Sequence, residues 1–240
     1  MRFEYAIASE GSTRSAYKGR NHDAFFVGEQ NGVLAFGVAD GCKPIVPAQI
    51  ASTELIESFK RHDPWTRGPV ECLRRSIKDR TFIDKLCLAE RVHDMLAETT
   101  GVLCRLDSNG VLCAAYIGDS EIRVFNGELI FSEPHQSITD NKVCLDRVID
   151  KSTSVYDVEA FCHQKLDCKR SGSDRHIQLE PDTIVIALTD GAYKKIPWYW
   201  WNWISTARKY ISLQAIADQL VKEGRQYDDA TAVVVRVRSD

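Results

Sequence analysis

The chain has 240 residues, of which 44% are hydrophobic and 27% charged, a composition of folded globular proteins rather than of disordered, collagen-like or coiled-coil chains. Its 31 Lys and Arg residues against 34 Asp and Glu give a net charge of −3, so we expect neither nucleic acid nor an acidic membrane surface as a partner. No apolar stretch is long enough to span a bilayer, and no secretory signal is visible at the N-terminus.

No repeat, low-complexity tract or linker-like stretch divides the sequence, which predicts one domain over residues 1–240. The eight cysteines are scattered, without the CxxC spacing of a zinc or redox motif. Scattered cysteines in apolar runs are typical of reduced, buried thiols. Together with the missing signal, they lead us to expect a cytoplasmic protein.

The first half of the chain combines short strands with two helices. Apolar runs bounded by Gly, Asn, Ser or Asp predict strands over residues 3–8, 24–27 and 33–39. Apolar residues spaced close to a 3.6-residue period predict helices over residues 47–60 and 81–97.

The second half opens with two hairpins, because Asn-Gly pairs accept the positive φ of a tight turn. The paired strands are expected over residues 101–107 with 111–117, and 122–125 with 129–131. Residues 133–180 are polar and weakly patterned and give no element. A strand, two helices and a closing strand follow over residues 183–188, 197–210, 213–221 and 231–237. Since strands outnumber helices and arrive as hairpins, we expect a largely antiparallel sheet with helices outside it.

Aspartates stand at the ends of these predicted strands. Three apolar runs end in Asp and a small residue, and two begin with Asp: Asp40-Gly41, Asp119-Ser120 and Asp190-Gly191 at the ends, Asp23 and Asp228-Asp229 at the starts. In an antiparallel sheet the end of one strand lies beside the start of its neighbour, so these carboxylates can meet at one edge. The two glycines would let the backbone approach the same spot closely. Taken alone, each aspartate would more often be an ordinary turn residue than a ligand, but three such strand ends and two such strand starts together favour a shared site.

Several carboxylates can share a small volume only if cations offset them, because like charges raise one another's pKa. Oxygen-only ligand sets with this much negative charge suit magnesium or manganese rather than zinc or copper. Two such ions about 3.5–4 Å apart would clamp a phosphoryl group and activate a water as nucleophile. The pattern therefore predicts hydrolysis of a phosphate ester by direct attack of water, with no covalent enzyme intermediate.

Six short motifs follow one another along nearly the whole chain: Asn21-His-Asp23-Ala, Val38-Ala-Asp40-Gly41, Thr99-Thr-Gly101, Gly118-Asp119-Ser120, Thr189-Asp190-Gly191 and Asp228-Asp-Ala-Thr231. In this order they resemble the motifs of the metal-dependent serine/threonine protein phosphatases of type 2C, and of the small, divergent bacterial branch in particular. The resemblance implies an α+β fold, a four-layer α-β-β-α sandwich in which two mainly antiparallel sheets are flanked by helices.

The resemblance also implies a site for two manganese or magnesium ions. Asp40 would bridge the two ions, and the carbonyl of Gly41 would bind the second. Asp190 and Asp228 would hold the first ion, which makes Asp40, Asp190 and Asp228 the expected catalytic residues.

Other residues would complete this site. Asp23 would reach the ions directly or through water, and Asp119 matches the position of a third, weaker ion. Asp229 would lie behind the ligands. Lys18 stands where the family has an arginine that grips the phosphate, and Arg20 is near enough to take its place. We expect Lys18 and Arg20 to bind substrate, although a lysine binds as a point charge.

Besides Lys18, three further parts of the chain depart from the family pattern. His22 stands where an acidic or amide residue is common, and the run Cys42-Lys43-Pro44 replaces a glycine-containing loop in which the animal enzymes place a histidine, proposed as general acid. Lys194 stands where an acidic residue helps to hold the third ion in some members. The two-metal ligands remain, whereas the third ion and protonation of the leaving group are in question.

We expect a signalling enzyme that dephosphorylates phosphoserine or phosphothreonine in a protein substrate, with a cognate serine/threonine kinase. The alternative is a catalytically weak phosphatase-like domain that binds a phosphoprotein or partner through the aromatic run at residues 198–203. The altered loop at Cys42 and the lysine at position 18 favour the alternative, and the retained aspartates favour the enzyme. We expect the aromatic run to be buried, as large aromatic side chains usually are.

Overall fold

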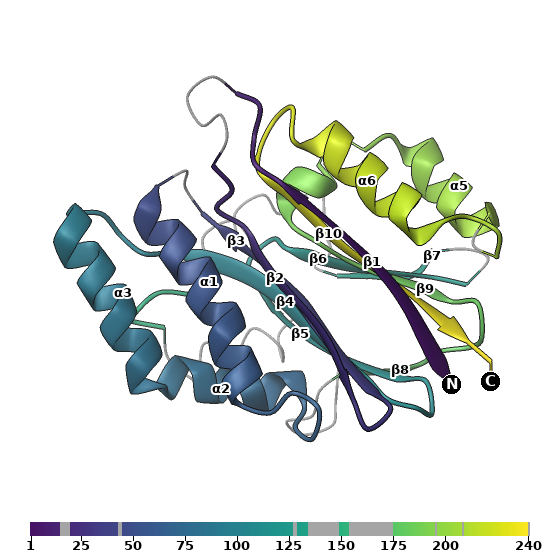
Figure 1. The fold of residues 1–240 in the computed structure, drawn as a ribbon, viewed down its shortest axis with the longest axis horizontal. Helices are drawn as coiled ribbons and strands as arrows, with labels where there is room; N and C mark the ends of the chain where they lie inside the picture. Colours follow the sequence, from purple (N-terminus) through teal and green to yellow (C-terminus); the bar gives the residue numbers. More distant parts are fainter. Residues whose placement is uncertain are drawn as a thin grey trace.

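The computed structural model describes residues 1–14, 20–42, 45–126, 129–133, 149–153, 175–194, 196–207 and 209–239. These residues form two antiparallel five-stranded sheets that pack face to face, with helices on the outer face of each (Figure 1). The predicted α+β fold, with four layers in the order α-β-β-α, is confirmed.

The two ends of the chain pair with each other in the first sheet. Its strand order is β1 (Arg2–Glu10), β10 (Ala230–Arg238), β9 (Ile184–Leu188), β6 (Glu121–Phe125) and β7 (Leu129–Glu133). The second sheet has the order β2 (Ala24–Gln30), β3 (Val33–Gly41), β4 (Thr99–Leu106), β5 (Val111–Ile117) and β8 (Arg175–Gln178).

Helices close the sandwich on both sides (Figure 1). The second sheet is covered by α1 (Val46–Arg61), α2 (Pro69–Lys78) and α3 (Arg80–His93), and the first by α5 (Trp198–Ala207) and α6 (Leu213–Gly224). A short 3₁₀ turn, η1 (Asp190–Ala192), follows β9. None of the helices in the described part of the chain is long and apolar enough to cross a bilayer.

The burial of β3 shows why the strands are apolar on both faces. Leu34, Phe36 and Val38 point into the core between the sheets, and Ala35 and Ala39 point into the core under α1 to α3. A strand buried on both sides reads as a continuous apolar run rather than as an alternation. The small residues on the helix side let α1 pack closely on the sheet.

The predicted strands and helices are all present, and among the described residues the helix α2, the strand β8 and the 3₁₀ turn η1 were not predicted. Helix α2 carries Pro69 at its start and buries Val70, Leu73 and Ile77, so its helical spacing was present in the sequence. Strand β8 lies in the weakly patterned stretch and pairs with β5 at the edge of its sheet. Residues 134–148 and 154–174 of that stretch lie outside the described residues.

The expectation that the aromatic run is buried is wrong: Trp198, Tyr199 and Trp203 are exposed, and Trp200 and Trp201 are only partly buried. Trp198 is 77% and Tyr199 56% exposed on the outer face of α5. Trp201 instead packs against the core under the helix, with its ring stacked on Phe125 at a centroid distance of 6.0 Å. The guanidinium of Arg123 lies over the same indole, 4.0 Å from its centroid.

Candidate metal centre

Three strand ends bring three carboxylates together. Asp40 is the penultimate residue of β3, Asp119 lies in the turn between β5 and β6, and Asp190 follows β9. Each offers one oxygen, and the three oxygens lie within 4.8 Å of one another. The side chains of Asp119 and Asp190 are 13% and 14% exposed. Three of the predicted ligands therefore meet, but not at the edge of a single sheet as expected: β3 and β5 belong to one sheet and β9 to the other, and the packing of the two sheets brings Asp190 to the other two.

Asp23 and Asp228 lie beside this cluster. The hydroxyl of Thr189 donates a hydrogen bond to Asp23 Oδ2 over 2.8 Å, which links Asp23 to the residue before Asp190. The other oxygen, Asp23 Oδ1, is buried and has no hydrogen-bond partner. Asp228 accepts a hydrogen bond from the backbone N–H of Asp229 over 3.0 Å.

The charges of these residues are unfavourable without a cation. Burial raises the pKa of Asp40 well above its ordinary value, and the charges of Asp23, Asp190, Asp119 and Asp228 raise it further. Burial also raises the pKa of Asp23 to about 8, and that of Asp228 in the same direction. Carboxylates that disfavour their own ionisation, with one buried oxygen unpaired, fit a hard divalent cation such as Mg²⁺ or Mn²⁺.

Two glycines permit the close backbone packing around the cluster. A Cβ atom on Gly191 would lie 1.9 Å from the carbonyl oxygen of Asp229, and one on Gly41 would lie 2.8 Å from that of His22. Both positions therefore require glycine, as the sequence indicated. The proposed role of the Gly41 carbonyl as a ligand stays a prediction.

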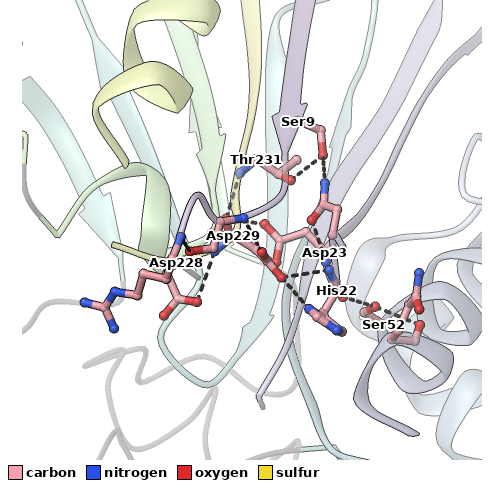
Figure 2. A network of polar contacts seen from close by, with 12 residues as sticks. Ser9, His22, Asp23, Ser52, Asp228, Asp229 and Thr231 are labelled. Atoms are coloured by element: carbon pink, nitrogen blue, oxygen red, sulfur yellow. Dashed lines mark hydrogen bonds and ion pairs between the residues drawn. The ribbon is translucent and has the colours of Figure 1, made fainter. Parts of the chain in front are cut away.

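A network around Asp229 connects the segments that carry the predicted ligands Asp23 and Asp228 (Figure 2). Asp229 Oδ2 accepts hydrogen bonds from the backbone N–H and the Nδ1 atom of His22, over 2.8 and 2.6 Å. Asp229 Oδ1 accepts one from the backbone N–H of Ser12 over 2.7 Å. The hydroxyl of Ser52 on α1 donates to the carbonyl of His22 over 2.5 Å. The prediction that Asp229 lies behind the ligands agrees with these contacts.

Hydroxyl groups extend this network to Asp23 (Figure 2). Ser9 and Thr231 share a hydrogen bond of 2.7 Å between β1 and β10, and the backbone N–H of Thr231 donates to the Thr189 hydroxyl over 2.9 Å. The amide of Asn21 donates to Ser9 over 2.8 Å and accepts from the backbone N–H of Asp23 over 3.0 Å. Asp23 is thus held between elements of both sheets.

Neither a protein-family model nor a curated protein matches the chain. Solved structures match along its length. PppA, described as a key regulatory component of T6SS in Pseudomonas aeruginosa, has a TM-score of 0.71 at 16% identity, with 98% of each chain covered. The catalytic domain of the serine/threonine protein phosphatase PstP, in complex with two manganese ions, has a TM-score of 0.58 at 16% identity, with 99% of each chain covered.

The PP2C phosphatase domain of the cell-fate determinant SpoIIE from Bacillus subtilis is also similar. It has a TM-score of 0.56 at 17% identity, over 100% of this chain and 64% of that one. The chain has the type 2C phosphatase fold. At these identities the likeness shows the fold, and the chemistry must be argued from the residues of this chain.

Within this type 2C fold, Lys194 contacts the acidic cluster directly. Its Nζ atom lies 3.1 Å from Asp119 Oδ2 and forms a closer ion pair with Asp190 Oδ2. Burial alone would lower the pKa of Lys194, but the two carboxylates raise it above its ordinary value, so the ammonium stays charged. The sequence shows the lysine at this position, but the contact with Asp119 follows only from the fold.

Of the two basic residues expected to bind substrate, Lys18 and Arg20, the structure describes only one. Lys18 lies outside the described residues, and Arg20 is exposed. Substrate binding by these two residues therefore stays a prediction. Cys42, which replaces the histidine of the animal enzymes, is partly buried, and burial raises the pKa of its thiol. A thiol held in its protonated form is a poor nucleophile, so nothing at Cys42 favours a covalent intermediate.

Proposed function

We propose that the protein is a metal-dependent phosphatase that hydrolyses phosphoserine and phosphothreonine in a protein substrate, by attack of water at a two-metal site. We also propose that residues 1–240 form one catalytic domain and that a serine/threonine kinase supplies its substrate. The observation that carries this function is the partly buried carboxylate cluster of Asp40, Asp119 and Asp190 at the strand ends of a type 2C phosphatase fold.

The proposed metal ligands come from different segments of the chain, and each has its own role. Asp40 would contact both ions, with Asp190 and Asp228 on the first, and Asp23 would support them from the side. Bound manganese or magnesium ions would stabilise the charge of the phosphoryl oxygens and lower the pKa of a water. The chain's own contribution is to hold these carboxylates close together and largely out of bulk solvent, where a bound cation would favour their ionised form.

The test is turnover of p-nitrophenyl phosphate and of a phosphothreonine peptide with manganese, magnesium or a chelator. We expect activity that requires the metal and falls by at least about 100-fold in Asp40→Asn and Asp190→Asn, because each change removes a ligand charge. Asp218→Asn on the exposed face of α6 is the matched control and should retain activity. Folded protein that binds manganese and turns over neither substrate would overturn the enzyme.

That outcome would favour the second candidate, a phosphatase-like binding domain. One observation supports it, which is the exposure of Trp198 and Tyr199 on the outer face of α5, at 77% and 56%. Large aromatic side chains are uncommon on a free surface and frequent at interfaces. The retained carboxylates have no purpose in that reading, so we rank it second.

A further inference from the structure

The Lys194 ammonium occupies a defined place in the acidic cluster. It bridges Asp119 Oδ2, at 3.1 Å, and Asp190 Oδ2, which it contacts more closely. These are two of the three carboxylates whose oxygens converge within 4.8 Å. The lysine therefore contributes a positive charge at the point where negative charge is concentrated.

The backbone holds the lysine in this place. The N–H of Lys194 donates to the carbonyl of Asp190 over 3.0 Å, so the turn η1 carries the side chain back over the carboxylate of the same turn. The neighbouring Tyr193 is buried, and its hydroxyl donates to the carbonyl of Asp119 over 2.8 Å. Both carboxylates that Lys194 contacts are thus tied to its own segment.

An ammonium and a divalent ion compete for the same oxygens. Magnesium and manganese bind carboxylate oxygens at about 2.0–2.2 Å and are repelled by a fixed positive charge nearby. Asp119 Oδ2 already accepts a hydrogen bond from the charged ammonium of Lys194. Hydrogen bonds from charged donors are among the stronger ones that a carboxylate can accept.

We propose that Lys194 is a built-in cation that takes the place of one divalent ion between Asp119 and Asp190. The inference rests on the proposed function, because it presumes that the cluster binds metal. The wild-type chain would therefore bind one divalent ion fewer than the same carboxylates would bind without the charge of Lys194. The charge that a further metal ion would supply comes instead from the protein.

The test is the number of manganese ions bound per chain, measured by isothermal titration and by elemental analysis after equilibrium dialysis. Lys194→Met keeps the length of the side chain and removes its charge. We expect this variant to bind one ion more than the wild type, and the additional ion to be lost in Lys194→Met combined with Asp119→Asn.

The matched control is Lys209→Met, which removes a lysine paired with Asp182 at 3.7 Å, away from the cluster. It should bind as many ions as the wild type. Melting curves in chelator confirm that each variant is folded. A wild type and Lys194→Met with the same ion number would overturn the inference, and so would weaker binding by Lys194→Met, which would make the lysine a support for the ligands. Failure of the wild type itself to bind manganese would overturn the proposed function and the inference together.

Discussion

His22 and Asp229 form a buried pair that joins the two sheets beside the acidic cluster. His22 Nδ1 lies 2.6 Å from Asp229 Oδ2, and the two side chains are 1% and 7% exposed. His22 precedes β2 by two residues, and Asp229 immediately precedes β10 of the other sheet. Each partner is the sequence neighbour of a proposed ligand, Asp23 or Asp228. The pair therefore fixes the relative position of two ligand-bearing strand starts.

Asp229→Ala should destabilise the metal-free protein by about 3 kcal/mol, because it leaves two buried backbone N–H groups and an imidazole without their acceptor. Urea unfolding in chelator measures the change. Asp218→Ala on exposed α6 is the control and should stay within about 0.5 kcal/mol of the wild type. Equal losses in the two variants would show that the network contributes nothing.

Most helices and strands, and the aspartates of the cluster, could be predicted from the sequence because their signals are local. Period and turn signals lie within a few residues of each other, and an Asp after an apolar run marks a strand end wherever it occurs. The pairing of β3, β4 and β5 brings Asp40 and Asp119 to the same edge of one sheet, whereas Asp190 follows β9 of the other sheet and joins them through the packing of the two sheets, which the sequence does not encode locally. Helix α2 had the same local signal, in Val70, Leu73 and Ile77, and was nevertheless not predicted.

The remaining features depend on contacts between distant residues. The partners His22 and Asp229 are 207 positions apart, and no periodicity relates them. Lys194 could be recognised as unusual at its position, but its contact with Asp119 depends on how the turn η1 sits against the β5–β6 turn. The burial of each tryptophan in α5 depends on which face of the helix packs against the sheet. Because nearly every position in the first half of α5 is aromatic, the sequence does not indicate which face that is.

Asp40→Asn should have opposite effects on the stability of the metal-free protein and on its stabilisation by manganese. The buried Asp40 carboxylate is repelled by its neighbours, so replacing it with a neutral amide should stabilise the metal-free protein by about 1 kcal/mol. Manganese should then raise the stability of the wild type far more than that of the variant. Urea unfolding with chelator and with manganese measures both effects. A variant less stable than the wild type in chelator would contradict the electrostatic account of the cluster.

The stability of the metal-free protein should fall as the pH rises from about 6.5 to about 8. Asp23 has its pKa raised from 3.8 to about 8 by burial, so over this range the folded state holds a proton that the unfolded chain has released. Asp40 and Asp228 shift in the same direction. His62, whose pKa is lowered by burial, opposes this trend only below about pH 6.5, where the unfolded chain takes up a proton.

Urea unfolding in chelator at several pH values measures this slope. Asp23→Asn is the matched variant and should show a smaller slope, because it lacks the titrating group. Manganese affinity should rise over the same pH range, since the ion must displace the proton. Stability that is constant or increasing between pH 6.5 and pH 8 would mean that these carboxylates are ionised in the folded protein without a cation.

Trp198 and Trp201 both lie in α5, and replacing each of them with alanine should affect the free energy of unfolding very differently. Trp201 stacks on Phe125 and lies under the guanidinium of Arg123, so Trp201→Ala should cost about 3 kcal/mol through the cavity and the lost cation–π contact. Trp198→Ala removes a side chain that is 77% exposed and should change stability by less than about 0.5 kcal/mol. Urea unfolding of the two variants compares them directly.

Trp198→Ala should also retain turnover of p-nitrophenyl phosphate, because Trp198 lies on α5 and is not part of the acidic cluster. A loss of stability in Trp198→Ala as large as that in Trp201→Ala would place its indole inside the fold and remove the exposed aromatic face on which the binding-domain alternative depends.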